Sequence, residues 1–153
     1  MHIGHSKINN GIELYGQAAP SHLDKIQVQQ NRILKILFNK DFRTPTLSLH
    51  TEINVLMVKD LHKQNVAKFV YQHQNLGLPD VFVNFYENNQ SIHDHNTRQA
   101  NNIHIGPRRT EQGKKMMSYT GAKIWNDLPE YVKNSQTITT FKKHLKKTIV
   151  NDY

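Results

Sequence analysis

The sequence contains no cysteine among its 153 residues. This absence excludes both a disulfide framework and any zinc site built on thiolate ligands. No run approaches the roughly 18 apolar residues of a membrane span, and residues 1–10, MHIGHSKINN, lack the apolar stretch of a secretion signal. We therefore expect a protein with no membrane partner that works inside the cell, in the nucleus or the cytoplasm.

Apolar residues are scarce as well. They make up 37% of the chain, with a single tryptophan, Trp125, whereas globular domains usually reach about 45–50%. A chain of this composition can form a hydrophobic core, but only a small one. We expect a small core with long polar connections.

Motifs of known catalytic chemistry are also missing. There is no GxSxG, no serine with an obvious base beside it, no Walker A sequence and no GxGxxG. The carboxylates are scattered singly, so no Asp-Asp or Asp-x-Asp pair could hold two magnesium ions for nucleotidyl transfer. The chain alone is predicted to be a non-enzyme without catalytic residues or a cofactor.

The ten histidines raise the question of a metal site. His93 and His95 lie in an Asn-rich stretch with His104 nearby, but no further ligand is evident. His62 and His73 are eleven residues apart and cannot form the i, i+4 pair of a helical zinc site. We expect no metal site.

Positive charge is concentrated in the C-terminal part. Residues 1–94 carry 9 Lys and Arg against 8 Asp and Glu, a net charge of +1, whereas residues 95–153 carry 11 against 4, a net charge of +7. Clustered cations favour contact with a polyanion because they displace counterions from its phosphates. A solvated lysine-rich surface explains the same charge equally well.

Two basic groups are the candidate contacts for RNA or DNA, expected to be weak and non-specific. Arginine suits bidentate phosphate contact, and loop backbone N–H groups could add donors. The first group surrounds Trp125 in sequence, and the second lies on the flank of a terminal helix. The candidates are Arg98, Arg108, Arg109, Lys114 and Lys115, then Lys142, Lys143, Lys146 and Lys147.

Apolar periodicity predicts a mainly α fold with little or no β. Residues 22–39 should form an amphipathic helix capped by Ser21, and residues 54–75 a longer one ended by Gly77 and Pro79. We expect the two to pack as a long hairpin over residues 20–76, with Thr46 capping a short turn between them. The predicted stripes comprise Leu23, Ile26, Ile33, Leu34, Leu37 and Phe38, then Val58, His62, Val66, Phe69, His73 and Leu76, with Leu61 and Val70 on the edges of the second stripe.

The C-terminal region is predicted to hold a short helix and a terminal one. The short helix presents Trp125 and stops before Pro129; the terminal helix, capped by Ser135 or Thr137, carries Ile138, Phe141, Leu145 and Ile149 on one stripe. Trp125 is expected to anchor the core, with base stacking as the alternative. The chain thus divides into an N-terminal start without a recognisable pattern (1–10), a helical hairpin region (11–83), a polar Asn-rich loop (84–112) and a basic helical region (113–153).

Seven phrases in order resemble the C-terminal region of reverse transcriptases encoded by non-LTR (LINE-type) retrotransposons, after the polymerase palm and thumb. They cover roughly residues 11–149 and include the phrase IWN-x-LP. The phrases are GIELYG, IQVQQNRILKILFN, RTPT, INVLMVKDLHKQNVAKFVYQ, HNTRQ, RRTEQGKKMMSYTGAKIWNDLP and FKKHLKK.

This resemblance implies a tail region of an RNA-directed DNA polymerase. The aspartate-containing catalytic box of the palm is absent here, so the chain would have no polymerase activity by itself. In a parent protein it would adjoin the thumb and palm and help to hold template RNA or target DNA. The alternative is an inert relic or a protein-interaction module with a merely solvated basic surface.

Overall fold

The structure, a computed structural model, describes residues 20–92 and 99–153. Across these two ranges the chain is mainly helical and forms no strand, and a single isolated antiparallel bridge joins Asn88 to Ile103. The predicted fold class is therefore confirmed. The phrase GIELYG lies outside the described residues.

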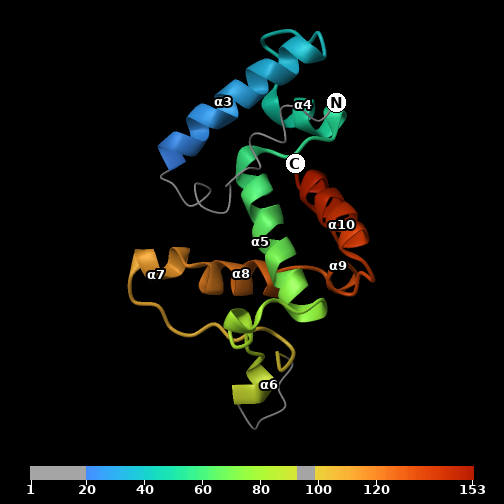
Figure 1. The fold of residues 1–153 in the computed structure, drawn as a ribbon. Helices are drawn as coiled ribbons and strands as arrows, with labels where there is room; N and C mark the ends of the chain where they lie inside the picture. Colours follow the sequence, from blue (N-terminus) through green and yellow to red (C-terminus); the bar gives the residue numbers. More distant parts are fainter. Residues whose placement is uncertain (1–19, 93–98) are drawn as a thin grey trace. The chain divides into compact units, whose positions relative to one another are not determined.

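The helices are short apart from three (Figure 1). In chain order they are α3 (Pro20–Leu37), α4 (Thr46–Ile53), α5 (Val58–Asn75), the 3-10 turn η1 (Asp80–Phe82), α6 (Asn89–Ile92), α7 (Glu111–Lys115), α8 (Met117–Asn126), α9 (Glu130–Lys133) and α10 (Ile138–Asn151).

Two compact units divide the chain. The first comprises Met1–Asn65 with Lys143–Tyr153, and the second comprises Val66–Lys142. Each is therefore built partly from α5 and partly from α10. Each unit is described by itself below.

The connection between the two long N-terminal helices differs from the prediction. Thr46 is the first helical residue of α4, whose N-cap is Pro45, so Thr46 does not cap a mere turn. Asn54 ends α4 in the left-handed conformation, with φ 53°, and its N–H bonds back to the carbonyls of His50 and Thr51. Because Asn54 is a C-cap, α5 starts at Val58 and not at residue 54. Ser21, predicted as a cap, already lies within α3.

In the first unit, α3 turns a largely polar side toward its neighbours. Gln30 donates to the Leu56 carbonyl at 2.9 Å, and Gln27 accepts from the Val58 N–H at 2.8 Å. Of the stripe predicted for this helix only Leu34 is buried, while Ile33 and Leu37 are exposed. That stripe was placed wrongly because hydrogen bonding, which apolar periodicity does not register, determines which side of α3 faces inward.

A buried histidine is part of the same polar packing. His50 is fully buried, with its Nδ1 2.9 Å from the Val55 carbonyl and its Nε2 2.9 Å from Asn31 Oδ1. Tyr153 packs edge-on against the His50 ring, and the Tyr153 hydroxyl donates to Asp60 at 2.7 Å. The last residue of the chain thereby contributes to the core of the first unit.

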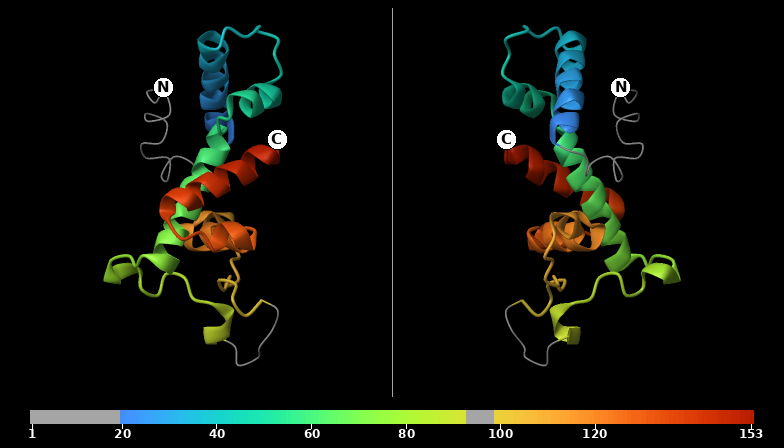
Figure 2. Two further views of the ribbon diagram at one scale, coloured as in Figure 1. Left: turned by 90° about the vertical axis from the view of Figure 1, so that its right-hand side faces the viewer. Right: turned by 90° about the vertical axis from the view of Figure 1, so that its left-hand side faces the viewer.

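In the second unit, α8 runs across the second half of α5 (Figures 1 and 2). The approach is close at Gly121, where an added Cβ would come within 3.0 Å of Val70 Cγ2 and 2.0 Å of the Tyr86 hydroxyl oxygen. The inward side of α5 includes Val66, Val70 and Tyr71. The predicted stripe was wrong at Leu76, which is 60% exposed. Gly77 adopts φ 71°, as expected of a residue that ends a helix in the left-handed conformation.

The segment predicted as one polar loop, residues 84–112, has local structure in its described parts, 84–92 and 99–112. It contains α6, and its two arms are tied by backbone hydrogen bonds from His104 to Glu87 at 2.7 Å and from Asn89 to Asn102 at 2.9 Å. Glu111 already belongs to α7. Short polar stretches of this kind carry no apolar period, so their local order escapes a search for periodicity.

Candidate nucleic-acid interface

The four terminal lysines lie on α10, where Lys143 and Lys147 are opposite its buried side and Lys142 and Lys146 are at the border of that side. Phe141, Leu145 and Ile149 are buried, which confirms most of the predicted stripe. Thr137 caps the helix by accepting from the Thr140 N–H at 3.2 Å. Lys142, Lys143 and Lys147 are exposed and Lys146 is half-buried. Within the described ranges none of the four forms an ion pair.

Lys142 has a second cation as its neighbour. Partial burial lowers the pKa of Lys142, and repulsion from Lys68 on α5 lowers it further. Both lysines belong to the second unit. Repulsion between like charges disfavours the charged form, so an anion placed between them would be stabilised. Lys68 and Lys142 are therefore like charges close enough to repel each other, and neither forms an ion pair with a described residue.

The loop arginines precede α7. Arg108 and Arg109 are exposed, and a Cβ added at Gly113 would lie 3.5 Å from Arg108 Cβ. The Arg108 side chain thus runs along the first turn of α7, whose N-cap Thr110 accepts from the Gly113 N–H at 3.1 Å. Packing restrains the position of Arg108 while the residue remains accessible.

The two lysines at the end of α7 differ. Lys114 donates to Glu111 at 2.6 Å, and this hydrogen bond raises the pKa of Lys114 and lowers that of Glu111. Lys115 is exposed and has no ion pair among the residues described. Lys115 is thus a better candidate for phosphate contact than Lys114, whose charge already has a partner.

The candidates are distributed over both units. Lys143, Lys146 and Lys147 belong to the first unit, whereas Arg108, Arg109, Lys114, Lys115 and Lys142 belong to the second. It stays a prediction that the basic residues around α7 and the lysines of α10 bind the same ligand. Arg98 lies outside the described residues.

Trp125 is buried, as predicted, with 8% of its surface exposed. Its ring stacks on Phe141 with centroids 6.1 Å apart, and Phe141 stacks in turn on Tyr71 at 4.5 Å. The Tyr71 hydroxyl donates to the Ser135 carbonyl at 2.7 Å. A ring enclosed in this way cannot offer its face to a nucleobase, so the base-stacking alternative for Trp125 is not supported.

Two further histidines of the described part of the chain have local partners. His73 Nε2 lies 2.8 Å from the Phe82 carbonyl, and His104 Nδ1 lies 3.1 Å from Asn89 Oδ1. Among the described residues, no group of three or more His, Asp or Glu side chains is arranged to hold a metal ion. His93 and His95 fall outside the described ranges.

Sequence reasoning missed Lys68. It lies on α5, 74 positions before Lys142, and no spacing rule connects the two. The available signal was the position of Lys68 in the sequence between Val66 and Phe69, two residues of the predicted apolar stripe.

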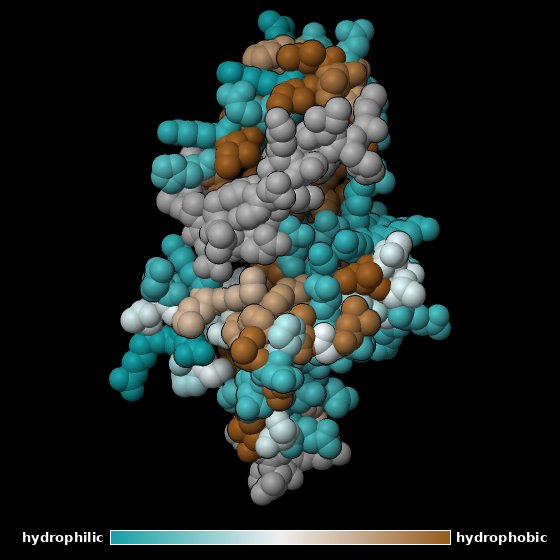
Figure 3. Space-filling view, in the orientation of Figure 1, coloured by the Kyte–Doolittle hydropathy of each residue, from teal (hydrophilic) through white to brown (hydrophobic). Residues whose placement is uncertain are grey.

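Apolar surface is exposed at the other end of the chain. Ile36 and Phe42, near the connection of α3 to α4, are 79% and 76% exposed. Figure 3 shows apolar atoms interspersed with hydrophilic ones over this part of the molecule. None of the helices described here combines the length and the apolar character needed to cross a membrane.

Comparison with known proteins finds no family model, no curated protein and no solved structure that matches the chain.

Proposed function

We propose that the chain is a non-catalytic, nucleic-acid-contacting region of the kind that follows the palm and thumb in non-LTR retrotransposon reverse transcriptases. The seven ordered phrases support the family origin. The accessory role is supported by the exposed basic residues. In a parent polymerase, the thumb and palm would be its neighbours and would supply the chemistry.

The observation that carries the contact role is the unbalanced charge on α10. Four lysines lie within six residues, and none has an acidic partner in the described part of the chain. Burial, and then repulsion from Lys68, lowers the pKa of one of them, Lys142. Lysines that only keep a protein soluble do not need to lie so close together that their charges repel one another. A phosphate backbone relieves the repulsion and releases its own counterions on binding.

This arrangement favours weak binding with little sequence preference. Lysine ammonium groups act as point charges and do not read the edges of bases. Single-stranded RNA or DNA is therefore the proposed ligand class for this surface.

A protein-interaction module, or a relic without activity, is the second candidate. Three exposed apolar residues of α3 favour this candidate, because a charged sugar–phosphate backbone would not bury aliphatic side chains. They are Ile33, Ile36 and Leu37. In that case the basic residues are a solvated surface only.

Salt dependence distinguishes the two candidates. The affinity of the full chain for a labelled single-stranded oligonucleotide is measured by fluorescence anisotropy across a salt series. If about four phosphates are neutralised, log K should fall against log salt with a slope of roughly −3. Replacing Lys142, Lys143, Lys146 and Lys147 with glutamine should flatten the slope and leave the helical circular dichroism unchanged, because the buried stripe is untouched. Replacing Arg108 and Arg109 should act in the same direction.

A matched pair of variants controls for net charge alone. Lys25→Gln with Lys59→Gln removes two exposed lysines from α3 and α5, and Lys143→Gln with Lys147→Gln removes two from α10. The α10 pair should weaken binding more than the control pair. No binding at low salt, or equal effects of the two pairs, would favour the second candidate.

A further inference from the structure

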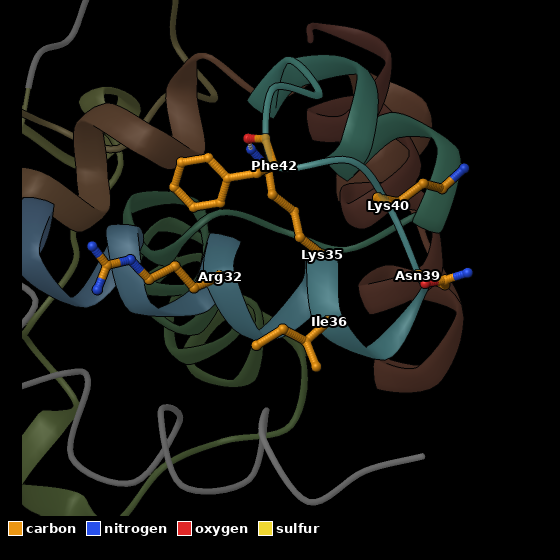
Figure 4. Close-up of a pocket in the computed structure, with 6 residues that line it drawn as sticks. All are labelled: Arg32, Lys35, Ile36, Asn39, Lys40 and Phe42. Atoms are coloured by element: carbon orange, nitrogen blue, oxygen red, sulfur yellow. Dashed lines mark hydrogen bonds between the residues drawn. The ribbon is translucent and has the colours of Figure 1, made fainter.

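A pocket of about 480 Å³ lies in the first unit, where α3 ends and the chain turns toward α4 (Figure 4). This volume is within the roughly 300–1,000 Å³ typical of ligand sites. Three of the lining residues are cations and none is acidic. The lining residues are Arg32, Lys35, Ile36, Asn39, Lys40 and Phe42.

The turn fixes Phe42 while leaving its ring exposed. Asn39 adopts φ 48°, and the Lys40 N–H bonds to the Lys35 carbonyl at 2.8 Å, which reverses the chain at the end of α3. Lys35 Nζ donates to the Phe42 carbonyl at 2.6 Å and lies 5.4 Å from the centroid of the Phe42 ring. Phe42 is nevertheless 76% exposed. A hydrophobic ring held in place at the surface is available to a partner.

The cations around the ring are not equivalent. Lys40 pairs with Glu52 on α4, so its charge is largely balanced. Arg32 forms neither a hydrogen bond nor an ion pair with any described residue. Figure 4 shows the Arg32 guanidinium and the Phe42 ring projecting to the same side of the pocket. A ligand that reaches Phe42 therefore also meets a guanidinium that no described acidic residue neutralises.

We propose that this pocket is a subsite for single-stranded nucleic acid, in which one unstacked base lies on Phe42 and its phosphate contacts Arg32 and Lys35. An aromatic side chain beside cations is the combination that such proteins use, because every base has a π face and every nucleotide carries a charge. An acidic peptide would satisfy the cations but would leave the ring exposed. The inference rests on the proposed function and places one of its contacts outside the basic C-terminal region.

The test measures binding of the full chain to a short oligouridylate at low salt. Phe42→Leu keeps an apolar side chain but removes the stacking surface, and the affinity should fall roughly 5- to 150-fold. Phe42→Tyr should retain the wild-type affinity. Arg32→Gln should reduce the steepness of the salt dependence by about 0.7, which corresponds to one phosphate.

Two controls separate stacking from charge and from folding. Phe42→Leu should leave binding of inorganic polyphosphate unchanged, because that polyanion has no bases. Tyr131→Leu, which removes another exposed ring from the second unit, should leave oligouridylate binding unchanged. Helical circular dichroism checks that each variant is folded.

The possible failures can be distinguished. Wild-type binding with an equal affinity of Phe42→Leu would overturn the base subsite and leave the proposed function intact. Equal weakening of polyglutamate and oligouridylate binding by Arg32→Gln, with no effect of Phe42→Leu on either, would overturn the base subsite and identify an acidic-peptide site instead. No wild-type binding to the oligonucleotide at low salt would refute both proposals.

Discussion

Replacing Trp125 with alanine tests the packing of the second unit most directly. Its ring is the outer member of a stack that continues through Phe141 of α10 to Tyr71 of α5. Phe141 and Tyr71 are almost completely buried, and only 8% of Trp125 is exposed. The substitution would leave Phe141 without the partner that covers one of its faces.

The expected loss follows from the area involved. A buried aromatic side chain removes roughly 150–250 Å² from water, which at about 25 cal/mol per Å² amounts to roughly 4–6 kcal/mol. Alanine keeps part of this burial, so Trp125→Ala should lower the free energy of unfolding by roughly 3–5 kcal/mol, as for other large aromatics in cores. Urea titration followed by far-ultraviolet circular dichroism measures this change without relying on tryptophan fluorescence.

A neighbouring substitution provides the control. Lys123 is exposed on the same helix, and Lys123→Ala should change the free energy of unfolding by no more than about 0.5 kcal/mol. A loss below about 1 kcal/mol for Trp125→Ala would refute the packing argument and return the ring to the surface as a stacking candidate.

Three further predictions concern other parts of the molecule. Asn126 binds both the N–H and the carbonyl of Ile103 at 2.9 Å, so Asn126→Asp should cost roughly 1–3 kcal/mol in urea titrations, whereas Asn134→Asp at an exposed position should be nearly neutral. Burial lowers the pKa of His50 below 6.5, despite opposing effects of Val55 and Asp60. The unfolded chain therefore binds more protons below that pH, and stability should be complete above about pH 6.5 and decline on acidification; constant or rising stability on acidification would contradict this. Pure protein should show no primer extension with template and magnesium, and chelator-sensitive extension would disprove the non-catalytic assignment.

Apolar periodicity predicted the buried residues correctly where a helix packs with apolar side chains on one side and exposes polar side chains on the other. The terminal helix is the clearest example, since Phe141, Leu145 and Ile149 are buried as predicted and the lysines are outside. The end of α5 was also predictable, because the left-handed conformation of Gly77 follows from the freedom of glycine to adopt positive φ.

Periodicity failed where polar side chains form the interior. α3 faces its unit with Gln27, Gln30 and Asn31, which bond to His50, to Leu56 and to the start of α5. An analysis of apolar periodicity assigns a glutamine to the solvent-facing side of a helix, even where the glutamine is buried and bonded to a distant partner. The partners come from α4, from the connection that follows it and from the start of α5, and no local pattern in α3 specifies them. The pocket around Phe42 was missed for the same reason, since Lys35 reaches the Phe42 carbonyl only once the turn has formed.

The phrase IWN-x-LP, central to the family resemblance, has a structural use at nearly every position. Trp125 enters the ring stack, Asn126 holds the Ile103 backbone, Leu128 is buried, and Pro129 is the N-cap of α9. Residues engaged in packing have no free group to offer a ligand. The resemblance in this phrase therefore bears on how the chain folds, and the nucleic-acid role depends on residues outside it. Those are the lysines of α10, Lys68, and the exposed ring of Phe42, so measurements on these side chains, and not on the conspicuous phrase, determine whether the proposed function holds.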